Sequence, residues 1–131
     1  MPIKDDRPGS LRTESIELPQ GKGAARAARA AVDTLTRDLG ELYHDVRLLV
    51  SELVTTAADG MNEAVRLRVE LSISRVAVRV VVRYEDTGGI VTGLEPPVVG
   101  QWTHMLLDAL TSAWGTGDDG DACLWFEMGR G

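Results

Sequence analysis

This sequence has few of the residues that mark a disulfide-rich or metal-binding protein, and few aromatic residues. It has one cysteine, Cys123, among 131 residues, which excludes an internal disulfide framework and a metal site built on cysteines. Cys123 lies in the apolar run ACLWF, so we interpret it as a small core residue rather than a nucleophile. Aromatic residues make up only 5% of the chain, so the core must be built from Val, Leu and Ala. A reducing cytoplasm is the simplest setting.

Long apolar runs are lacking as well. No stretch approaches the roughly 20 apolar residues of a membrane-spanning helix, and the opening MPIKDDRPGS has no apolar segment typical of a secretory signal. We therefore expect a cytoplasmic protein without a membrane partner, in which residues 1–12 form a flexible tail. Acidic residues outnumber basic ones by 20 to 14, giving a net charge of -6. Because nucleic-acid binding needs a basic surface, we expect no nucleic-acid partner.

The apolar pattern that is present predicts one α+β domain over residues 13–131. Alternation with period two predicts strands, and spacing of three and four residues predicts helices. Gly115 and the acidic run at 118–121 are expected to form a turn. The result is a two-layer sandwich with a mixed, mainly antiparallel sheet of about four strands and three helices on one face. We expect strands near 13–18, 65–73, 76–84 and 122–128, and helices near 22–39, 42–58 and 102–114.

One long loop is predicted at 87–101, TGGIVTGLEPPVVGQ, because its Gly and Pro residues oppose both helix and strand. The loop also carries apolar residues. Two interpretations stay open: a functional lid or partner surface, and a loop packed on its own core.

Four segments resemble a known family. DVRLLVSELVTTAADG resembles the N-box helix of the GHKL, or Bergerat-fold, histidine kinase-like ATPases, and VVVRYEDTGG stands where the first glycine box is expected. LPQGKGAARAARAAVDTL resembles the opening strand and helix of that family, and HMLLDALTSAWG with CLWFEM its closing helix and strand. The resemblance is closest to the small anti-sigma-factor serine kinases of actinobacteria, and the excess of Arg over Lys fits a GC-rich genome.

The resemblance gives roles to two residues of the N-box helix. In the family, a glutamate acts as general base, and an asparagine four residues later holds Mg²⁺ against the triphosphate. Here the glutamate is Glu52, but the second position is Thr56, which lacks the amide oxygen suited to Mg²⁺. Glu52 is therefore either an idle base or simply a polar helix residue.

The resemblance also implies two glycine boxes, and both depart from the family pattern. The first reads Asp86-Thr87-Gly88-Gly89-Ile90, with the adenine-binding Asp86 and with Gly88 in place but Ile90 instead of the second glycine. Asp86 is alternatively a turn-capping residue. The second box reads Gly100-Gln101-Trp102, so an indole stands where backbone should cradle phosphate. We expect Trp102, Ile90 or both to fill volume that the nucleotide occupies in active relatives.

These losses suggest a regulator of pseudokinase type. The segment 87–101 also lacks the basic residues of the family's lid. The resemblance implies binding to a sigma factor or a STAS-domain anti-anti-sigma protein, possibly as a homodimer, with neither ATP nor Mg²⁺ as a cofactor. The alternatives are an active serine kinase in which Thr56 holds Mg²⁺ and Glu52 is the base, binding of another small ligand, or one subunit of a heteromer.

Other polar and aromatic residues suggest no further site. His44 and His104 are far apart in sequence without a third ligand, so we expect no metal. The acidic run at 118–121 lacks the spacing of a calcium-binding loop and is interpreted as a solvated turn. Trp125 is expected to be a core residue.

Overall fold

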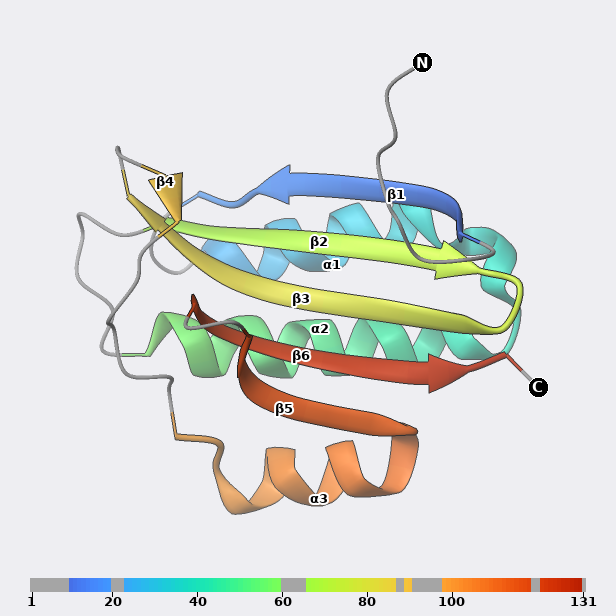
Figure 1. Cartoon of the computed structure of the whole chain (residues 1–131). Helices are drawn as coiled ribbons and strands as arrows, with labels where there is room; N and C mark the ends of the chain where they lie inside the picture. The colour runs from blue at the N-terminus through green and yellow to red at the C-terminus, as the bar shows by residue number, and fades with distance from the viewer. Residues whose placement is uncertain are drawn as a thin grey trace.

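The chain folds into an antiparallel sheet with helices packed against one of its faces (Figure 1). This computed structural model describes residues 10–19, 23–59, 66–86, 89–90, 98–118 and 121–130. The elements follow in the order β1 (Ser10–Glu17), α1 (Gly23–Leu35), a short 3-10 helix (Arg37–Leu39), α2 (Leu42–Ala58), β2 (Arg66–Ser74), β3 (Ala77–Asp86), β4 (Gly89–Ile90), α3 (Gln101–Leu110), β5 (Ala113–Asp118) and β6 (Asp121–Gly129).

The sheet has the strand order β1-β2-β3-β6-β5, and the two-residue strand β4 pairs with the end of β3. This confirms the predicted α+β class and the β2–β3 hairpin. The expectation of a mixed sheet of about four strands was wrong: five long strands are present, and every pairing within the described part of the chain is antiparallel. In Figure 1, α1 and α2 lie behind the sheet, and α3 lies along its β5 edge.

The core lies between the sheet and the helices and is mainly aliphatic, as the composition predicted. Alternate residues of the central strands point toward the helices, so the side chains on one face of each strand are buried. Phe126 and Tyr84 are the two aromatic residues of this cluster. The strands contribute Leu67, Val69, Leu71, Ile73, Val78, Val80, Val82, Leu124 and Met128, and the helices contribute Ala24, Ala28, Val32, Val46, Leu49, Val50, Leu53, Val54 and Leu107.

The first helix is shorter than predicted. The apolar spacing suggested a helix over 22–39, but α1 ends at Leu35 and a separate 3-10 helix follows. The Thr36 hydroxyl donates a hydrogen bond to the Val32 carbonyl at 2.7 Å, and the Arg12 guanidinium donates to the Leu35 carbonyl. The Val32 carbonyl still accepts the helical bond from the Thr36 amide at 2.9 Å, whereas the Leu35 carbonyl, an acceptor that a continuing helix would use, accepts from Arg12. Gly40, with φ of 63°, then turns the chain into α2.

The third helix also ends early, and a strand that the sequence did not predict follows it. The expected helix over 102–114 stops at Leu110, where the Thr111 hydroxyl donates to the Leu107 carbonyl at 2.6 Å. The Ser112 amide then donates to the Glu127 carbonyl at 2.8 Å and starts the pairing of β5 with β6. Gly115, predicted as a turn residue, therefore lies in an edge strand.

The first strand starts earlier than predicted. β1 begins at Ser10, so residues 10–12, assigned above to a flexible tail, belong to the sheet. Its register shifts between Ser10 and Arg12. Residues 1–9 and 91–97 lie outside the described part, and with them much of the predicted tail and loop. Among the helices that the structure describes, none has the length and apolar character to cross a bilayer.

Candidate functional site

Helix α2 carries the two N-box positions on its flank. Its apolar stripe, which includes Leu49 and Leu53, is fully buried against the sheet. Glu52 and Thr56 lie four residues apart and hence on one face of the helix, and both side chains are half-buried. The helix thus presents a carboxylate and a hydroxyl at the border of the core.

The first turn of α3 lies against this flank of α2. The Thr103 hydroxyl is 3.5 Å from Oε2 of Glu52, and Thr103 itself is buried, with 6% of its surface exposed. The helix begins after Gly100, whose φ of -68° and ψ of 164° are open to any residue, and no side chain caps it. Thr103 was not among the site residues predicted from the sequence. Its place three residues after Gly100, on the buried side of the helix, is the signal that was missed.

The end of β3, where Asp86 stands, is attached to the last turn of α2. The Tyr84 hydroxyl, two residues before Asp86, donates a hydrogen bond to the Ala57 carbonyl at 3.0 Å. Burial raises the pKa of Tyr84 to about 12. The backbone of Asp86 pairs with Gly89 in β4. The second half of α2 therefore contacts both the end of β3 and the start of α3.

The predicted site residues are brought together only in part. Glu52 and Thr56 share a helix face that the α3 start approaches. Gly88 and the side chains of Asp86 and Ile90 lie outside the described part. Whether Trp102, Ile90 or both fill nucleotide volume stays a prediction, because the Ile90 side chain lies outside the described part. The indole of Trp102 retains 61% of its surface exposed. The reason is its helical position, next to Thr103 in sequence and about 100° around the axis from that buried side chain.

The two histidines occupy separate surroundings. His44 packs edge-on against Tyr43, with ring centroids 5.0 Å apart. His104 packs edge-on against Trp114 at 4.9 Å, and its Nδ1 is 3.1 Å from Oδ2 of Asp108. Within the described ranges, no group of three or more His, Cys, Asp or Glu side chains could hold a metal ion.

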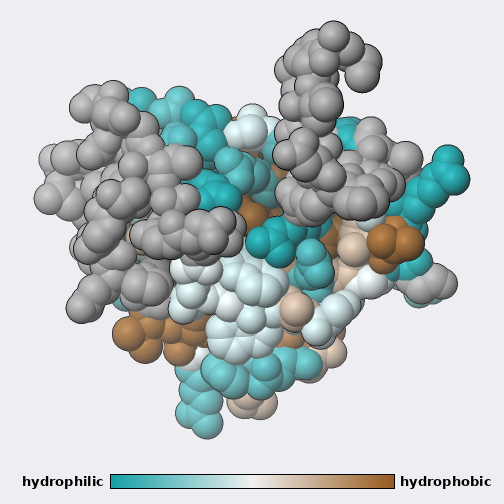
Figure 2. Space-filling view, viewed as in Figure 1, coloured by the Kyte–Doolittle hydropathy of each residue, from teal (hydrophilic) through white to brown (hydrophobic). Residues whose placement is uncertain are grey.

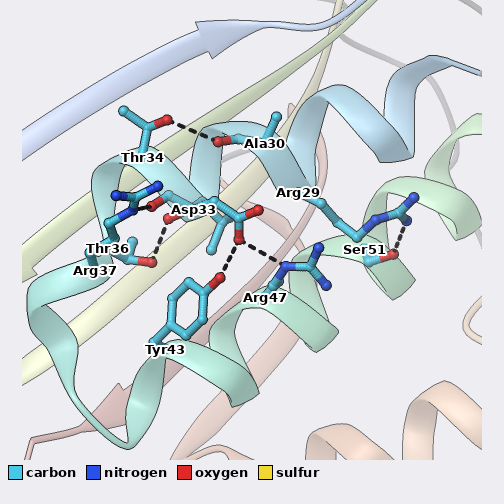
Figure 3. Close-up of polar contacts among 10 residues, drawn as sticks. Arg29, Ala30, Asp33, Thr34, Thr36, Arg37, Tyr43, Arg47 and Ser51 are labelled. Carbon is cyan, nitrogen blue, oxygen red and sulfur yellow. Dashed lines mark hydrogen bonds and ion pairs between the residues drawn. The ribbon is translucent and has the colours of Figure 1, made fainter.

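A polar cluster fixes α2 against α1 (Figure 3). Asp33 of α1 accepts hydrogen bonds from the Tyr43 hydroxyl and from Nε of Arg47, the latter at 2.8 Å. Arg29 donates to the Ser51 hydroxyl at 2.9 Å. The hydrogen bond from Tyr43, helped by Arg47, lowers the pKa of Asp33, and the same bond raises the pKa of Tyr43. This cluster was not predicted from the sequence, because its members pair across helices rather than at a regular spacing.

The other face of the sheet, turned to the viewer in Figures 1 and 2, carries charged residues in pairs. Arg68 binds Glu85 and Arg83 binds Glu70, both at 2.8 Å. Figure 2 shows teal and white side chains over the middle of this face.

Trp125 lies on this outer face rather than in the core, which corrects its predicted role. The Arg79 guanidinium stacks on its ring at 4.6 Å, a cation–π contact. Its neighbour Cys123 is fully buried, as the apolar run predicted.

Comparison of the sequence with protein-family models and with curated proteins gives no match.

Proposed function

We propose that this chain is a cytoplasmic regulator of the anti-sigma type, built on a histidine kinase-like ATPase fold of actinobacterial origin. In this proposal it binds a sigma factor or a STAS-domain anti-anti-sigma protein. It no longer binds ATP or transfers phosphate. The homodimer expected from the resemblance is part of the same proposal.

The observation that carries the proposal is the meeting of three chain segments. The resemblance assigns the N-box to α2, the first glycine box to the end of β3 and the second to the start of α3. These assignments were made from the sequence, yet the Tyr84–Ala57 and Thr103–Glu52 contacts join the same three segments along the second half of α2. The order of one strand, two helices, a hairpin, a helix and a final strand also agrees, with β5 as an addition.

Loss of nucleotide binding follows from the residues at this meeting point. Thr56 offers a hydroxyl where the family places an amide oxygen for Mg²⁺. Glu52, the base position, faces the Thr103 hydroxyl of its own chain, so one of its oxygens already has a partner. Phosphoryl transfer needs charge neutralisation by Mg²⁺ and close backbone approach to the phosphates. The change in the N-box weakens the binding of Mg²⁺, and the changes in both glycine boxes weaken the close approach of the backbone to the phosphates.

The test is partner capture with and without nucleotide. The tagged chain is expressed in its own host, and captured proteins are identified by mass spectrometry. We expect a sigma factor or a STAS-domain protein. The purified pair should then bind with the same affinity in the presence and absence of Mg²⁺-ATP. The variant Glu52→Ala should change the Kd by less than about threefold, below ~1 kcal/mol.

Two outcomes would contradict the proposal. If neither partner class binds the purified chain, the regulatory function is wrong. If phosphate appears on a partner serine with Mg²⁺-ATP, and is lost in Glu52→Ala, the chain is an active kinase. Glu52→Gln is the matched control, because it keeps the side-chain length and an acceptor for Thr103 while it removes the base.

A further inference from the structure

A narrow crevice lies between strand β1 and helix α1, at the edge of the sheet. It contains about 270 Å³ of empty space, part of which is open to solvent. Its lining is apolar except for one residue, Glu14. Some lining residues are buried and others are half-buried, so the crevice has an inner part and a side that water reaches. Val32, Val50 and Leu71 belong to the inner part, and Glu14, Ile16 and Ala31 to the solvent side.

The crevice exists because α1 packs over β1 with small side chains. Ala28 and Ala31 line it from the helix, and an alanine methyl group does not reach far enough to fill the space. On β1, every second residue faces the helices, and Glu14 is one of them: it stands opposite Leu71 of β2. A carboxylate therefore occupies a position where the alternation of the strand calls for an apolar side chain.

The Glu14 carboxylate has no cation of its own chain to pair with. Arg12, two residues earlier on the same side of β1, donates to the Leu35 carbonyl at the end of α1. Among the residues that the structure describes, none forms a hydrogen bond or an ion pair with Glu14. A half-buried carboxylate beside apolar surface is best satisfied by a cation that brings an apolar stem with it. The lining thus matches a ligand with a positive charge at one end and a short hydrocarbon chain at the other.

We propose that this crevice binds a small linear alkylamine in its ammonium form. The ammonium group pairs with the Glu14 carboxylate, and the chain lies between Ala31 and Leu71. The inner part has room for about one water molecule, so it takes a slender chain and excludes a branched chain or a ring. A diamine is disfavoured, because its second charge would be buried among apolar side chains without an acceptor. This inference rests on the lining of the crevice and is independent of the proposed regulatory function.

The probe is n-butylammonium, and three ligands of similar length serve for comparison. They are 1-butanol, which has no charge, butyrate, which has the opposite charge, and 1,4-diaminobutane, which has a second positive charge. Binding to the full chain is followed by the assigned methyl signals of Ala28 and Ala31 in a two-dimensional NMR spectrum of protein labelled at alanine.

We expect a saturable shift of both methyl signals with n-butylammonium, at a Kd in the millimolar range, because the ligand has so few atoms. Binding of 1-butanol and of 1,4-diaminobutane should be weaker, and butyrate should give no saturable shift. Glu14→Gln keeps the shape and removes the charge, so it should raise the Kd for n-butylammonium by about tenfold, toward that of 1-butanol.

Two further variants locate the site. Ala31→Leu fills the crevice, so n-butylammonium should no longer shift the Ala28 signal, and the midpoint of urea unfolding should rise. Glu17→Gln is the matched control, because it is the same change on the same strand but on the other face of the sheet. Glu17 lies 3.4 Å from Arg66 there, and its substitution should leave the Kd unchanged.

Four results would overturn the proposal. Equal Kd values for n-butylammonium and 1-butanol would show that the charge is not recognised. A Kd unchanged by Glu14→Gln, or raised equally by Glu17→Gln, would place the ammonium group elsewhere. Binding that persists in folded Ala31→Leu would place the chain outside the crevice. Shifts of the two alanine methyl signals that do not saturate would show that the crevice takes no alkylamine. If Ala31→Leu does not fold, the ligand comparison and Glu14→Gln still decide.

Discussion

The Thr103 hydroxyl lies 3.5 Å from Oε2 of Glu52 and joins the first turn of α3 to the middle of α2. Among the described residues, it is the only hydrogen bond between side chains of these two helices. Thr103 is buried whereas Glu52 is half-buried, so water reaches the carboxylate more easily than the hydroxyl. The contact therefore orders the candidate site more than it stabilises the fold.

Two substitutions of Thr103 test this contact. Thr103→Val keeps the shape and removes the donor, so we expect a loss of about 1 kcal/mol or less in the free energy of unfolding by urea. Thr103→Asp places a second carboxylate beside Glu52, and its loss should be larger and should shrink in the background of Glu52→Gln. Equal losses in both backgrounds would show that Thr103 and Glu52 do not interact.

Gly115 of β5 lies directly against the ring of Trp125. A Cβ at this position would lie 3.0 Å from both Cζ2 and Nε1 of the indole, tighter than most contacts of a Cβ, so the ring would have to shift by a few tenths of an ångström. We expect Gly115→Ala to cost about 1–3 kcal/mol and to change the Trp125 fluorescence. In a Trp125→Ala background, the same substitution should cost little, because the clash is gone. A full cost in that background would assign the effect to the backbone instead.

The Asp33 cluster makes stability depend on pH in the acid range. Because the pKa of Asp33 is lowered on folding, its stabilisation is fully present above the ordinary value of 3.8 and is lost as pH falls through the folded pKa. Asp33→Asn should therefore be less stable than the parent near neutral pH, and the difference should narrow below about pH 4. Urea unfolding at several pH values measures it. A difference independent of pH would rule out the charge of Asp33 as the cause.

Tyr84 makes stability depend on pH in the alkaline range. Its pKa is raised to about 12 from 10.0, so the stabilisation is fully present below pH 10 and is lost as pH rises toward 12. Tyr84→Phe removes the hydrogen bond to Ala57 and should cost about 1 kcal/mol at neutral pH. The parent should lose stability more steeply than the variant above about pH 10. Parallel curves would show that the Tyr84 hydroxyl is not buried.

The strands and helices of the core could be predicted because their apolar residues repeat with clear periods. Val78, Val80 and Val82 alternate along a strand, and Leu49 and Leu53 recur at helical spacing. All five are buried, so the apolar pattern of the sequence matches the pattern of burial. β5 could not be predicted in this way. Trp114 continues the helical spacing of α3, and only pairing with β6 makes the segment a strand.

The site was predicted less completely than the fold. Glu52 and Thr56 were found by a motif, and their shared helix face followed from spacing four apart. Thr103 and the Asp33 cluster depend on which helix faces which, and that arises only from packing. Trp102 was expected to fill nucleotide volume on the strength of the motif, and that expectation stays a prediction. The periodicity of α3 already put it beside Met105 on the exposed side.

The central claim is that the fold is kept for binding proteins and no longer binds nucleotide. Its most direct test is a calorimetric titration of the purified chain with Mg²⁺-ATP and Mg²⁺-ADP. We predict no saturable heat with either nucleotide, and none after Thr56→Asn, which restores the N-box residue but not the glycine boxes. One-site binding with a Kd in the micromolar range, corresponding to about -8 kcal/mol, and its loss in Asp86→Asn would contradict the claim.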